Sequence, residues 1–357
     1  LENSVLFDGL PNFHTVDNSE IILGSKLGSG GFSNVNACCL QGVPLDESLA
    51  IKYLKREVMV KHKCFENGAA DLATEACFLA RLNHPNIVQL KAVTAGSVES
   101  NVSSGKEAGF FIVIDRLVET LYDRIERWQN QAEQLPSNLF YRMSKEYKET
   151  QRAMLAERLR VALDIANVME YLHSLKVIFR DLKPDNVGFD RNGTLKLFDF
   201  GLAKEQKPTM RFEDGTYKMT GKTGSRRYMA PEVGKALPYE KSVDVYSFGI
   251  LLWEMCSLEK PFAGYSSKKH YQLVMLGGER PKMDSSHTAH WPAALQSLMK
   301  ACWSANSETR PAFSAVKDTL EEVISDLSTT KSHFRSKSDG HKDESSSPST
   351  SAGQTRS

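Results

Sequence analysis

The alternation of apolar and polar positions divides the chain into two parts of different character. Before residue 116 it predicts short strands punctuated by glycines, over residues 21–27, 32–40, 49–54, 87–93 and 110–115. A helix is predicted among them at 71–82, where Leu72, Ala76, Leu79 and Ala80 recur at helical spacing. The first part is therefore expected to form a small, strand-rich lobe.

The second part of the chain has helical periodicity instead. Its clearest predicted helix spans 151–175, where apolar residues from Met154 to Leu172 form a broad stripe. Other helices are predicted at 119–128, 243–257, 271–276, 295–303 and 312–324, and two short strands flank a turn at 191–193. Together the two parts predict an α+β fold with a small β-rich N-terminal lobe and a larger, mainly helical C-terminal lobe.

Three polar segments interrupt or end these patterns. Residues 94–108 predict an extended loop, and residues 129–150 predict a polar insertion before the next helix. From residue 328 the composition is almost entirely polar, which is typical of disorder. We therefore expect an extension at 1–20, a folded domain at 21–327 with lobes at about 21–115 and 118–327, and a disordered tail at 328–357.

Composition narrows the class of protein. Lys and Arg number 45 against 44 for Asp and Glu, which argues against nucleic acid or an anionic membrane as a partner. No apolar run approaches the about 20 residues needed to cross a bilayer, and no secretory signal is visible. The 6 cysteines lack zinc-site spacing, so we expect free thiols in a reducing compartment, the cytoplasm or also the nucleus. The oligomeric state is not readable from the sequence.

Two features of the first lobe suggest anion binding. In the run 27–35, Gly28 and Gly30 would let two strands turn closely over a ligand with backbone N–H groups facing it. A simple hairpin turn is the alternative, because the features of a Walker or dinucleotide loop are missing. Lys52 lies inside an apolar strand, so it needs an anion unless it faces water at a sheet edge. The partner we expect is Glu75 on the following helix.

The segment 179–186, Phe-Arg-Asp-Leu-Lys-Pro-Asp-Asn, concentrates the groups that phosphoryl transfer requires. Asp181 can accept the proton of an attacking hydroxyl, and Lys183 can offset charge on the transferred group. Asn186 and Asp199, the latter in Asp-Phe-Gly at 199–201, can offer an amide oxygen and a carboxylate to Mg²⁺. Each residue alone could be an ordinary polar loop residue, but their grouping points to phosphoryl transfer.

On these motifs the chain resembles the eukaryotic protein kinase family, over about residues 20–325. The Gly-rich loop, strand lysine, helix glutamate, catalytic loop and Asp-Phe-Gly follow in the family's order, and Ala-Pro-Glu comes next at 230–232. The run 244–249 is similar to the family's anchoring helix, and Arg310 is similar to the arginine that pairs with Glu232. The resemblance implies the two-lobed protein kinase fold, ATP and Mg²⁺ as cofactors, and protein substrates.

The resemblance also implies a role for each site residue. Asp181 would be the catalytic base, and Lys183 would steady the γ-phosphate during transfer. Asn186 and Asp199 would bind Mg²⁺. The nucleotide-binding set would comprise Lys52 with its partner Glu75, Leu27, Gly28, Gly30, Val35, Ala50 and the backbone of Asp115 and Leu117. The resemblance implies two supporting residues as well. Ile114 would be the gatekeeper, and Asp244 would brace the catalytic loop.

Some positions depart from the family's pattern. Ser33 replaces the third glycine of the loop, a tolerated change, and Phe179 replaces a histidine where an aromatic side chain can still pack against the Asp-Phe-Gly region. Gly188 stands where many kinases place a leucine beneath the adenine. We therefore expect a looser adenine floor, unless Val187 or Phe189 fills it.

Specificity is indicated by two signals that point to one subgroup. Lys183 favours serine/threonine specificity, whereas Cys302-Trp303 and the run 310–313 resemble the ending of tyrosine kinases and the tyrosine-kinase-like group. We therefore expect a serine/threonine kinase of the tyrosine-kinase-like group. The alternatives are a pseudokinase, which typically lacks a member of the catalytic set complete here, a small-molecule kinase, and a nucleic-acid binder. Ala-Pro-Glu with an activation loop argues against the second, and balanced charge against the third.

The segment between the Asp-Phe-Gly and Ala-Pro-Glu motifs resembles the family's activation loop. In the family, an arginine such as Arg180 often pairs with a phosphate on this loop. Thr220 and Thr223 stand just before Gly224 and Ser225, which resemble the substrate-docking turn. We hypothesise that phosphorylation of either threonine orders the loop through Arg180, the alternative being that both are ordinary loop residues.

Overall fold

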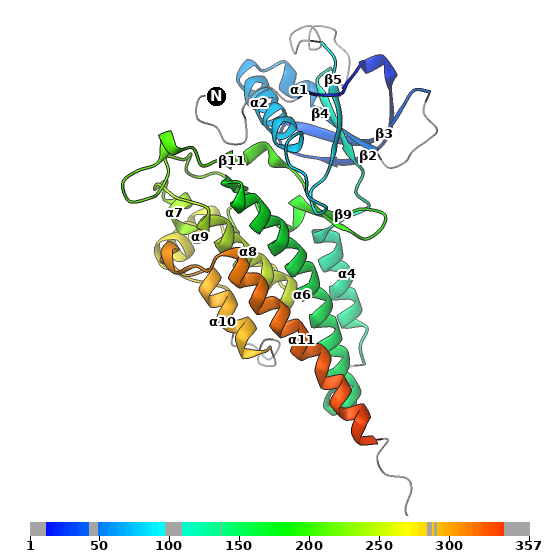
Figure 1. The fold of residues 1–357 in the computed structure, drawn as a ribbon, viewed down its shortest axis with the longest axis vertical. Helices are drawn as coiled ribbons and strands as arrows, with labels where there is room; N and C mark the ends of the chain where they lie inside the picture. Colours follow the sequence, from blue (N-terminus) through cyan, green and yellow to red (C-terminus); the bar gives the residue numbers. More distant parts are fainter. Residues whose placement is uncertain are drawn as a thin grey trace, which may run out of the picture.

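The N-terminal lobe is built on a sheet with strand order β1-β5-β6-β4-β3-β2 (Figure 1). The structure, a computed structural model, describes residues 12–42, 49–96, 109–136, 138–283, 288 and 291–338, with side chains as far as residue 329. The strands are β1 (Thr15–Val16), β2 (Ile21–Ser29), β3 (Ser33–Leu40), β4 (Leu49–Leu54), β5 (Leu90–Thr94) and β6 (Phe111–Asp115). The predicted strands of this lobe are confirmed, although β5 begins three residues later than the 87–93 we predicted.

β1 is an element that the sequence pattern did not predict. It pairs in parallel with β5, with Thr15 opposite Val93 and Val16 opposite Thr94, whereas the other pairs of this sheet are antiparallel. The side chain of Val16 is buried in a cluster with Ile51, Phe111 and other residues of the sheet. Two residues are too few for alternation to show, so only the tertiary contact reveals this strand.

The helices of this lobe are α1 (Arg56–Met59) and α2 (His62–Leu79). α2 lies beside the sheet (Figure 1) and buries Leu72, Glu75, Ala76 and Leu79. It begins nine residues before the helix we predicted at 71–82. Its first turns are largely exposed, and an exposed helical end shows no apolar periodicity. Glu75 is therefore a buried charge on an otherwise apolar face.

The C-terminal lobe consists mainly of helices. They are α4 (Leu121–Glu133), α5 (Leu139–Met143), α6 (Lys145–Ser174), α7 (Pro231–Gly234), α8 (Ser242–Ser257), α9 (Ser267–His270), α10 (Ala293–Cys302), α11 (Phe313–Ser338) and the π-helix η5 (Tyr271–Leu276). α8 is buried on all sides from Ser242 to Cys256 and forms the centre of the lobe. α6 and α11 pack side by side along their length (Figure 1). The predicted α+β class, with a β-rich first lobe and a helical second lobe, is confirmed.

Short strands and turns at the junction of the lobes place the catalytic loop. β9 (Val187–Phe189) lies between β7 (Glu119–Thr120) and β10 (Leu195–Leu197), and β8 (Val177–Ile178) pairs with β11 (Lys204–Glu205). The 3₁₀ turn η2 (Pro184–Asn186) ends the catalytic loop, and the 3₁₀ turn η3 (Phe200–Leu202) begins directly after Asp199 of the Asp-Phe-Gly segment. Residues 179–186 are thereby fixed between β8 and β9.

The polar segments contain more helix than the sequence pattern indicated. Residues 129–150 are largely helical, because α4 continues to Glu133, α5 follows, and α6 already begins at Lys145 with Ser144 as its N-cap. α11 runs to Ser338, ten residues past the point where we expected disorder to begin. Exposed helical turns carry polar side chains on every side, so apolar periodicity cannot detect them. Residues 97–108 of the predicted loop and residues 339–357 lie outside the described residues.

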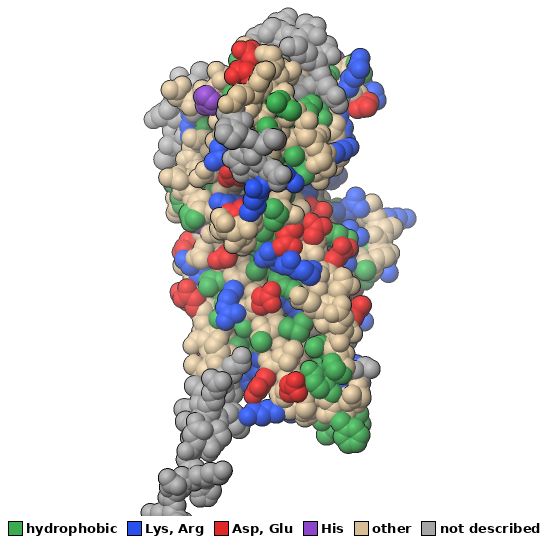
Figure 2. Space-filling model, turned by 90° about the vertical axis from the view of Figure 1, so that its right-hand side faces the viewer, with side chains coloured by type: hydrophobic (Ala, Val, Ile, Leu, Met, Phe, Trp, Pro, Cys, Tyr) green, Lys and Arg blue, Asp and Glu red, His purple; other side chains and the backbone are tan. Residues whose placement is uncertain are grey.

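The surface is mixed in charge, as the balanced composition predicts. Figure 2 shows acidic and basic side chains interspersed on one face, with apolar side chains gathered at its lower end. The most exposed apolar side chain of the described residues is Phe140 of α5, at 91%. All 6 cysteines are free thiols, and Cys38, Cys256 and Cys302 are buried. Within the described ranges, no helix combines the length and apolar character that a membrane crossing requires.

Candidate active site

The catalytic loop is held from below by Asp244 of α8, whose side chain is completely buried. Oδ2 of Asp244 accepts from the backbone N–H of Phe179 and contacts Nε2 of His173, both at 2.9 Å. Oδ1 accepts from the backbone N–H of Arg180 at 2.8 Å. These contacts stabilise an unusual backbone, because Arg180 has a φ of 71°. Asp244 thus lies where the sequence analysis expected a brace.

Asp181, Lys183 and Asn186 converge within this loop. Oδ2 of Asp181 contacts Nζ of Lys183 at 2.7 Å and accepts from Nδ2 of Asn186 at 2.9 Å. Oδ1 accepts from the backbone N–H of Ser225 at 2.7 Å. Lys183 also donates to Oγ of Ser225 at 2.9 Å. The carboxylate is therefore held in one orientation at the wall of the cleft, by residues from both the catalytic loop and the activation loop.

Ser225 is a further member of this cluster. We expected it in the substrate-docking turn beside Gly224, but not in contact with Asp181 and Lys183. Gly224 has a φ of 96°. A Cβ at Gly224 would lie 2.4 Å from the carbonyl oxygen of Arg180, so only glycine fits where the activation loop crosses the catalytic loop. This close approach brings the amide and hydroxyl of Ser225 to Asp181 and Lys183.

Lys52 of β4 joins the two lobes through two carboxylates. Its Nζ lies 2.5 Å from Oε2 of Glu75 on α2 and 2.8 Å from Oδ1 of Asp199. Glu75 is 1% exposed, whereas Asp199 is partly open to the cleft. Asp199 has a φ of 67°, a left-handed backbone that turns its carboxylate toward Lys52. The expected pair of Lys52 and Glu75 is present, and the structure adds Asp199 as a second partner.

The charges of this triad reinforce one another. Burial alone would lower the pKa of Lys52, but Glu75 and Asp199 outweigh burial and raise it. Burial alone would raise the pKa of Asp199, but Lys52 outweighs it, and with help from Lys183 the pKa falls below its usual range. Burial raises the pKa of Glu75, and Lys52 opposes that rise. Lys52 and Asp199 therefore favour each other's charged forms, and Lys52 opposes the neutralisation of Glu75 that burial favours.

Three aromatic rings connect α2 to the catalytic loop. Phe200 packs against Phe179 edge-on with ring centroids 5.1 Å apart, and against Phe78 of α2 at 6.3 Å. All three side chains are buried. Phe179, which replaces the family's histidine, therefore fills its position by packing against the Asp-Phe-Gly phenylalanine, as we expected. The packing of Phe200 thereby helps to hold its chain neighbour Asp199 in position.

The Gly-rich loop connects β2 and β3, and it leaves room for a ligand. The N–H of Gly30 donates to the carbonyl oxygen of Ser33 at 2.8 Å, and Nζ of Lys55 donates to the carbonyl oxygen of Gly30 at 2.5 Å. A Cβ at Gly28 would meet no atom within 4 Å. Leu27 on β2 is 39% exposed, Val35 lies opposite Gly28, and Ala50 is buried between β3 and β6.

Asp115 and Leu117 lie where the chain passes from the first lobe to the second, and they differ in the backbone groups that they can offer a ligand. The N–H of Asp115 donates to the carbonyl oxygen of Gln89 at 3.2 Å, and its carboxylate accepts from the N–H of Gln89 at 3.0 Å. No described residue hydrogen-bonds the backbone of Leu117. The N–H and C=O of Leu117 are therefore available to an adenine edge, whereas the N–H of Asp115 is already engaged.

The position beneath the expected adenine is filled in an unexpected way. A Cβ at Gly188 would lie 2.6 Å from Cδ1 of Leu117, 3.1 Å from the carbonyl oxygen of Glu119 and 3.3 Å from Cε1 of Phe198. The side chain of Leu117 thus occupies the space that a residue at 188 would need. We had expected an open floor, or one filled by Val187 or Phe189, and that expectation was wrong. Sequence gave no signal for it, because β9 and the lobe connection meet only in the folded chain.

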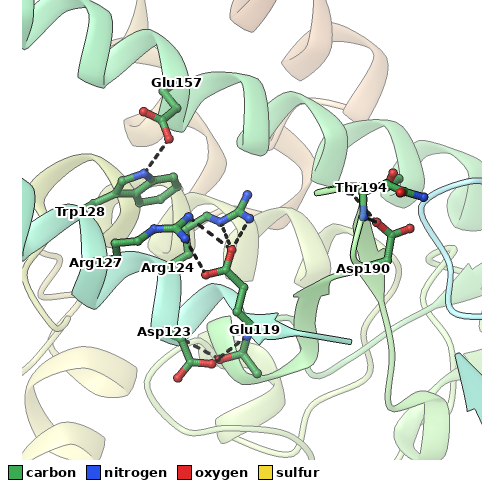
Figure 3. A network of polar contacts seen from close by, with 10 residues as sticks. Glu119, Asp123, Arg124, Arg127, Trp128, Glu157, Asp190 and Thr194 are labelled. Carbon is green, nitrogen blue, oxygen red and sulfur yellow. Dashed lines mark hydrogen bonds and ion pairs between the residues drawn. The ribbon is translucent and has the colours of Figure 1, made fainter. Parts of the chain in front are cut away.

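A network of charges anchors α4 next to this floor (Figure 3). Glu119 on β7 binds Nε of Arg124 at 2.7 Å and Nη1 of Arg127 at 3.2 Å. The guanidinium of Arg124 also lies 3.2 Å from the ring centroid of Phe189 on β9. One turn further along α4, Nε1 of Trp128 donates to Glu157 of α6 at 2.9 Å. The sequence analysis assigned no role to these residues, which fix the lobe connection to the helices below it.

The end of the activation loop is tied to the helical lobe by one ion pair. Nη1 of Arg310 lies 2.5 Å from Oε1 of Glu232, and Nη2 lies 3.0 Å from Oε2. This two-bond pair is the one that the resemblance implied. It is shielded from solvent, because the Arg310 side chain is completely buried.

Comparison with known proteins agrees with this arrangement. The family model described as "Protein kinase domain" matches residues 21–320. The chain is 33% identical to the serine/threonine/tyrosine-protein kinase HT1 of Arabidopsis thaliana, over 86% of this chain and 67% of that protein. It is 30% identical to the human receptor-interacting serine/threonine-protein kinase 1, over 86% of this chain and 41% of that protein. It is also 30% identical to the dual specificity protein kinase shkB of Dictyostelium discoideum, over 87% and 41%.

The match to the family model covers most of the chain and contains every catalytic motif described above. The chain spans less than half the length of two of the three relatives. The similarity therefore concerns the shared catalytic domain rather than the whole of those proteins. On this match, the chain belongs to the protein kinase family.

Proposed function

We propose that this chain is an active protein kinase that transfers the γ-phosphate of ATP to serine and threonine hydroxyls of proteins. The observation that carries the proposal is the convergence of Lys52, Glu75 and Asp199 on one side of the cleft with Asp181 and its partners on the other. A pseudokinase typically lacks a member of this set. We place the kinase domain at 21–327, with ATP, Mg²⁺ and protein substrates as its ligands.

The proposed chemistry starts from the orientation of Asp181. Its carboxylate would accept the proton of the substrate hydroxyl, and the donors from Ser225 and Asn186 would keep it aimed at that hydroxyl. Lys183, 2.7 Å from this carboxylate, would place a positive charge beside the transferred group. Positioning and charge stabilisation account for most of what a kinase contributes to phosphoryl transfer.

The residues present fit ATP and Mg²⁺. The amide nitrogen of Asn186 is used by Asp181, which turns the amide oxygen the other way, and Asp199 keeps an ionised, partly exposed carboxylate. Within the described ranges, no three His, Cys, Asp or Glu side chains form a metal site by themselves. Mg²⁺ commonly takes only one or two protein ligands and completes its shell with phosphates and water. Asn186 and Asp199 would hold the ion, which would bridge the phosphates and neutralise their charge.

The remaining nucleotide contacts follow from position. Lys52 would meet the α- and β-phosphates, with Glu75 holding it in place. Gly28 and Gly30 would let the loop lie close over the phosphates, while Leu27, Val35 and Ala50 would contact the adenine. The free backbone of Leu117 would hydrogen-bond the adenine edge, and Asp115 would contribute its carbonyl group. One measurement, the affinity for ATP, tests all of these assignments.

Specificity for serine and threonine is proposed on the contact of Lys183 with Ser225. This contact brings the catalytic and activation loops close to Asp181, which suits a short side chain rather than the longer tyrosine. The names of two relatives include tyrosine or dual specificity, so the acceptor residue is identified by direct measurement. The free thiols support a reducing compartment, and we propose the cytoplasm, with the nucleus also accessible.

Control by the activation loop is proposed on the contacts of Arg180. Its Nη1 donates to Oγ1 of Thr220 at 2.8 Å, and its Nε donates to the carbonyl oxygen of Leu202 at 2.6 Å. A phosphate on Thr220 would meet the same guanidinium as a bidentate ion pair. Phosphatase treatment should lower the activity of the unchanged chain. If a Thr220→Ala, Thr223→Ala variant is equally active before and after phosphatase treatment, and as active as the untreated chain, this control is absent.

The proposal is tested by incubating the chain with Mg²⁺, labelled ATP and generic protein substrates, beside an Asp181→Asn variant. We expect Mg²⁺-dependent phosphoserine and phosphothreonine that the variant does not produce. Phosphotyrosine alone would contradict the specificity. If the chain binds ATP, carries a phosphorylated activation loop and still transfers nothing, the pseudokinase interpretation holds instead.

A further inference from the structure

A cavity of about 450 Å³ lies between the end of the activation loop, α7, and the segment formed by α9 and η5. Its walls include Lys222, Gly224 and Arg226 of the loop, Gly234 of α7, His270 of α9 and the apolar Met275 of η5. Because it is open to solvent and built from three separate segments of the chain, a side chain of a bound protein could enter it.

The wall of the cavity adjoins Ser225, the residue that contacts Asp181. Gly224 and Arg226 form its wall, and Ser225 between them donates to Asp181 at 2.7 Å. A peptide whose hydroxyl approaches Asp181 therefore passes along Ser225. Since neighbouring residues of an extended chain are about 3.3–3.6 Å apart, the residue next to the acceptor would lie closest to the wall formed by Gly224 and Arg226.

The walls carry positive charge that nothing in the described structure balances. Lys222 and Arg226 are exposed, and no described acidic side chain forms an ion pair with either. Arg226 donates through Nη1 to Oγ of Ser267, which aims its guanidinium across the cavity toward α9. Lys268 on α9 is exposed beside it. The local field favours an anion.

His270 adds an unsatisfied polar group to the same walls. Its side chain is 2% exposed, and neither ring nitrogen has a hydrogen-bond partner in the described structure. Burial, together with the nearby charges of Arg226 and Arg227, lowers the pKa of His270 to about 4. The ring is therefore neutral at neutral pH and keeps one N–H to donate. Buried polar groups without partners are rare, and a ligand can supply the missing acceptor.

From these groups we infer that the kinase selects substrates with an anionic side chain, a carboxylate or a phosphate, next to the phosphorylated residue. The anion would bind Arg226 and Lys222 and accept from His270. A lysine or arginine at the same position would be repelled by both cations. This inference rests on the proposed kinase activity and adds the class of its substrates.

The test uses peptides that share one serine acceptor in a neutral sequence. Glutamate, glutamine or lysine is placed in turn at each position flanking the serine, and kcat/KM is measured for the unchanged, activated chain. We expect glutamate next to the serine to exceed glutamine by about tenfold, since two partly exposed ion pairs contribute about that much. Glutamate at more distant positions should have a much smaller effect. The preference should weaken as salt is added.

A charge reversal makes the test independent of protein folding. In a Lys222→Glu, Arg226→Glu variant, the preference should invert, so that the peptide with lysine becomes better than the peptide with glutamate. Loss of folding cannot produce an inversion. A Lys300→Gln variant, which changes an exposed lysine of α10 outside the cavity wall, is the matched control and should keep the original preference.

Phosphoserine in place of glutamate distinguishes the two sources of the anion. A preference for phosphoserine well above that for glutamate would identify substrates already phosphorylated by another kinase, and equal preferences would identify acidic sequences. If the unchanged chain phosphorylates the glutamate, glutamine and lysine peptides equally, the inference is wrong while the kinase activity stands. If it phosphorylates no peptide or protein, the proposed function itself fails.

Discussion

The catalytic loop and the floor of the expected adenine site differ in what determines the type of residue at each position. At the catalytic loop each position carries a particular functional group, and Asp181, Lys183 and Asn186 meet as their spacing predicts. At the floor, Gly188 carries no side chain, and Leu117 from another segment fills the space. Chemistry therefore fixes residue identity at the first region. At the second, only shape must be preserved, and any segment that reaches the space can supply it.

We expect the largest losses of kcat/KM where a charge of the candidate active site is removed. Lys52→Met should lower kcat/KM for phosphate transfer by about 10²–10³-fold, because the phosphates lose a preorganised cation and Glu75 loses its partner. Steady-state kinetics with ATP and a protein substrate measure the effect. Lys63→Met changes an exposed lysine on α2 and should alter kcat/KM by less than twofold, a bound set by the small effect of exposed charges. A loss below tenfold for Lys52→Met would contradict the comparison, because it would show that this region, like the adenine floor, depends on shape more than on charge.

Glu254 is a buried carboxylate whose pKa is raised by burial more than Tyr228, Lys260 and Arg227 lower it. Oε2 of Glu254 accepts from the hydroxyl of Tyr228 at 2.6 Å, and burial raises its pKa from 4.5 to about 7. A raised pKa means that the folded state binds the proton more tightly than the unfolded state. The stabilisation is complete below the unfolded pKa and is lost as the pH rises through about 7. The loss amounts to about 3 kcal/mol at most.

Glu254→Gln keeps an acceptor for Tyr228 and removes the titration. Melting temperatures measured between about pH 5 and about pH 8 should fall with pH for the unchanged chain and stay flatter for the variant. Glu259→Gln, an exposed carboxylate shortly after α8, is the control and should follow the unchanged chain. Parallel curves for the unchanged chain and Glu254→Gln would show that Glu254 does not titrate in this range.

At the adenine floor we expect a smaller effect. A leucine at either position 117 or position 188 should be able to fill the same space. Leu117→Ala removes the floor, and Gly188→Leu places two leucines in one space, so each should weaken ATP binding by about tenfold. The double variant should recover affinity to within about threefold, because the leucine at 188 then fills the space vacated at 117. Calorimetric titration with ATP measures all three variants.

The control for the floor is Val118→Ala, which truncates the neighbouring side chain, 55% exposed. It should leave the affinity for ATP unchanged. If the double variant binds no better than the weaker single variant, the two residues do not share one space. In that case the glycine would serve the close approach of Glu119 rather than the floor.

The smallest effect concerns the support beneath the floor. Arg124→Lys loses both the stacking on Phe189 and the forked contact with Glu119, which should lower the free energy of unfolding by about 1 kcal/mol. Urea unfolding measures the loss. Arg127→Lys changes a half-exposed side chain bound to the same glutamate and should cost less. Equal costs for the two variants would show that stacking contributes nothing.

Sequence was informative where function restricts residue type and uninformative where tertiary contacts decide. The motifs around Asp181 and Asp199 could be found because phosphoryl transfer requires those groups at close spacing. The helical turns of 129–150 were missed because polar exposed turns resemble loops. Ser225, the Leu117 floor and the two-residue strand β1 involve segments distant in the chain. No local pattern reports such contacts.

The strand order also affects how the protein behaves in concentrated solution. The large sheet has two edge strands, the two-residue β1 and the longer β2, which leads into the Gly-rich loop. An open edge invites strands of other molecules to add to it and start aggregation. The pairing of β2 with β3 shifts register on both sides of Lys26, so the edge presents a broken ladder and a charge. The register shifts beside the Gly-rich loop thus also make strand addition at this edge, and with it fibrous assembly of the protein, less favourable.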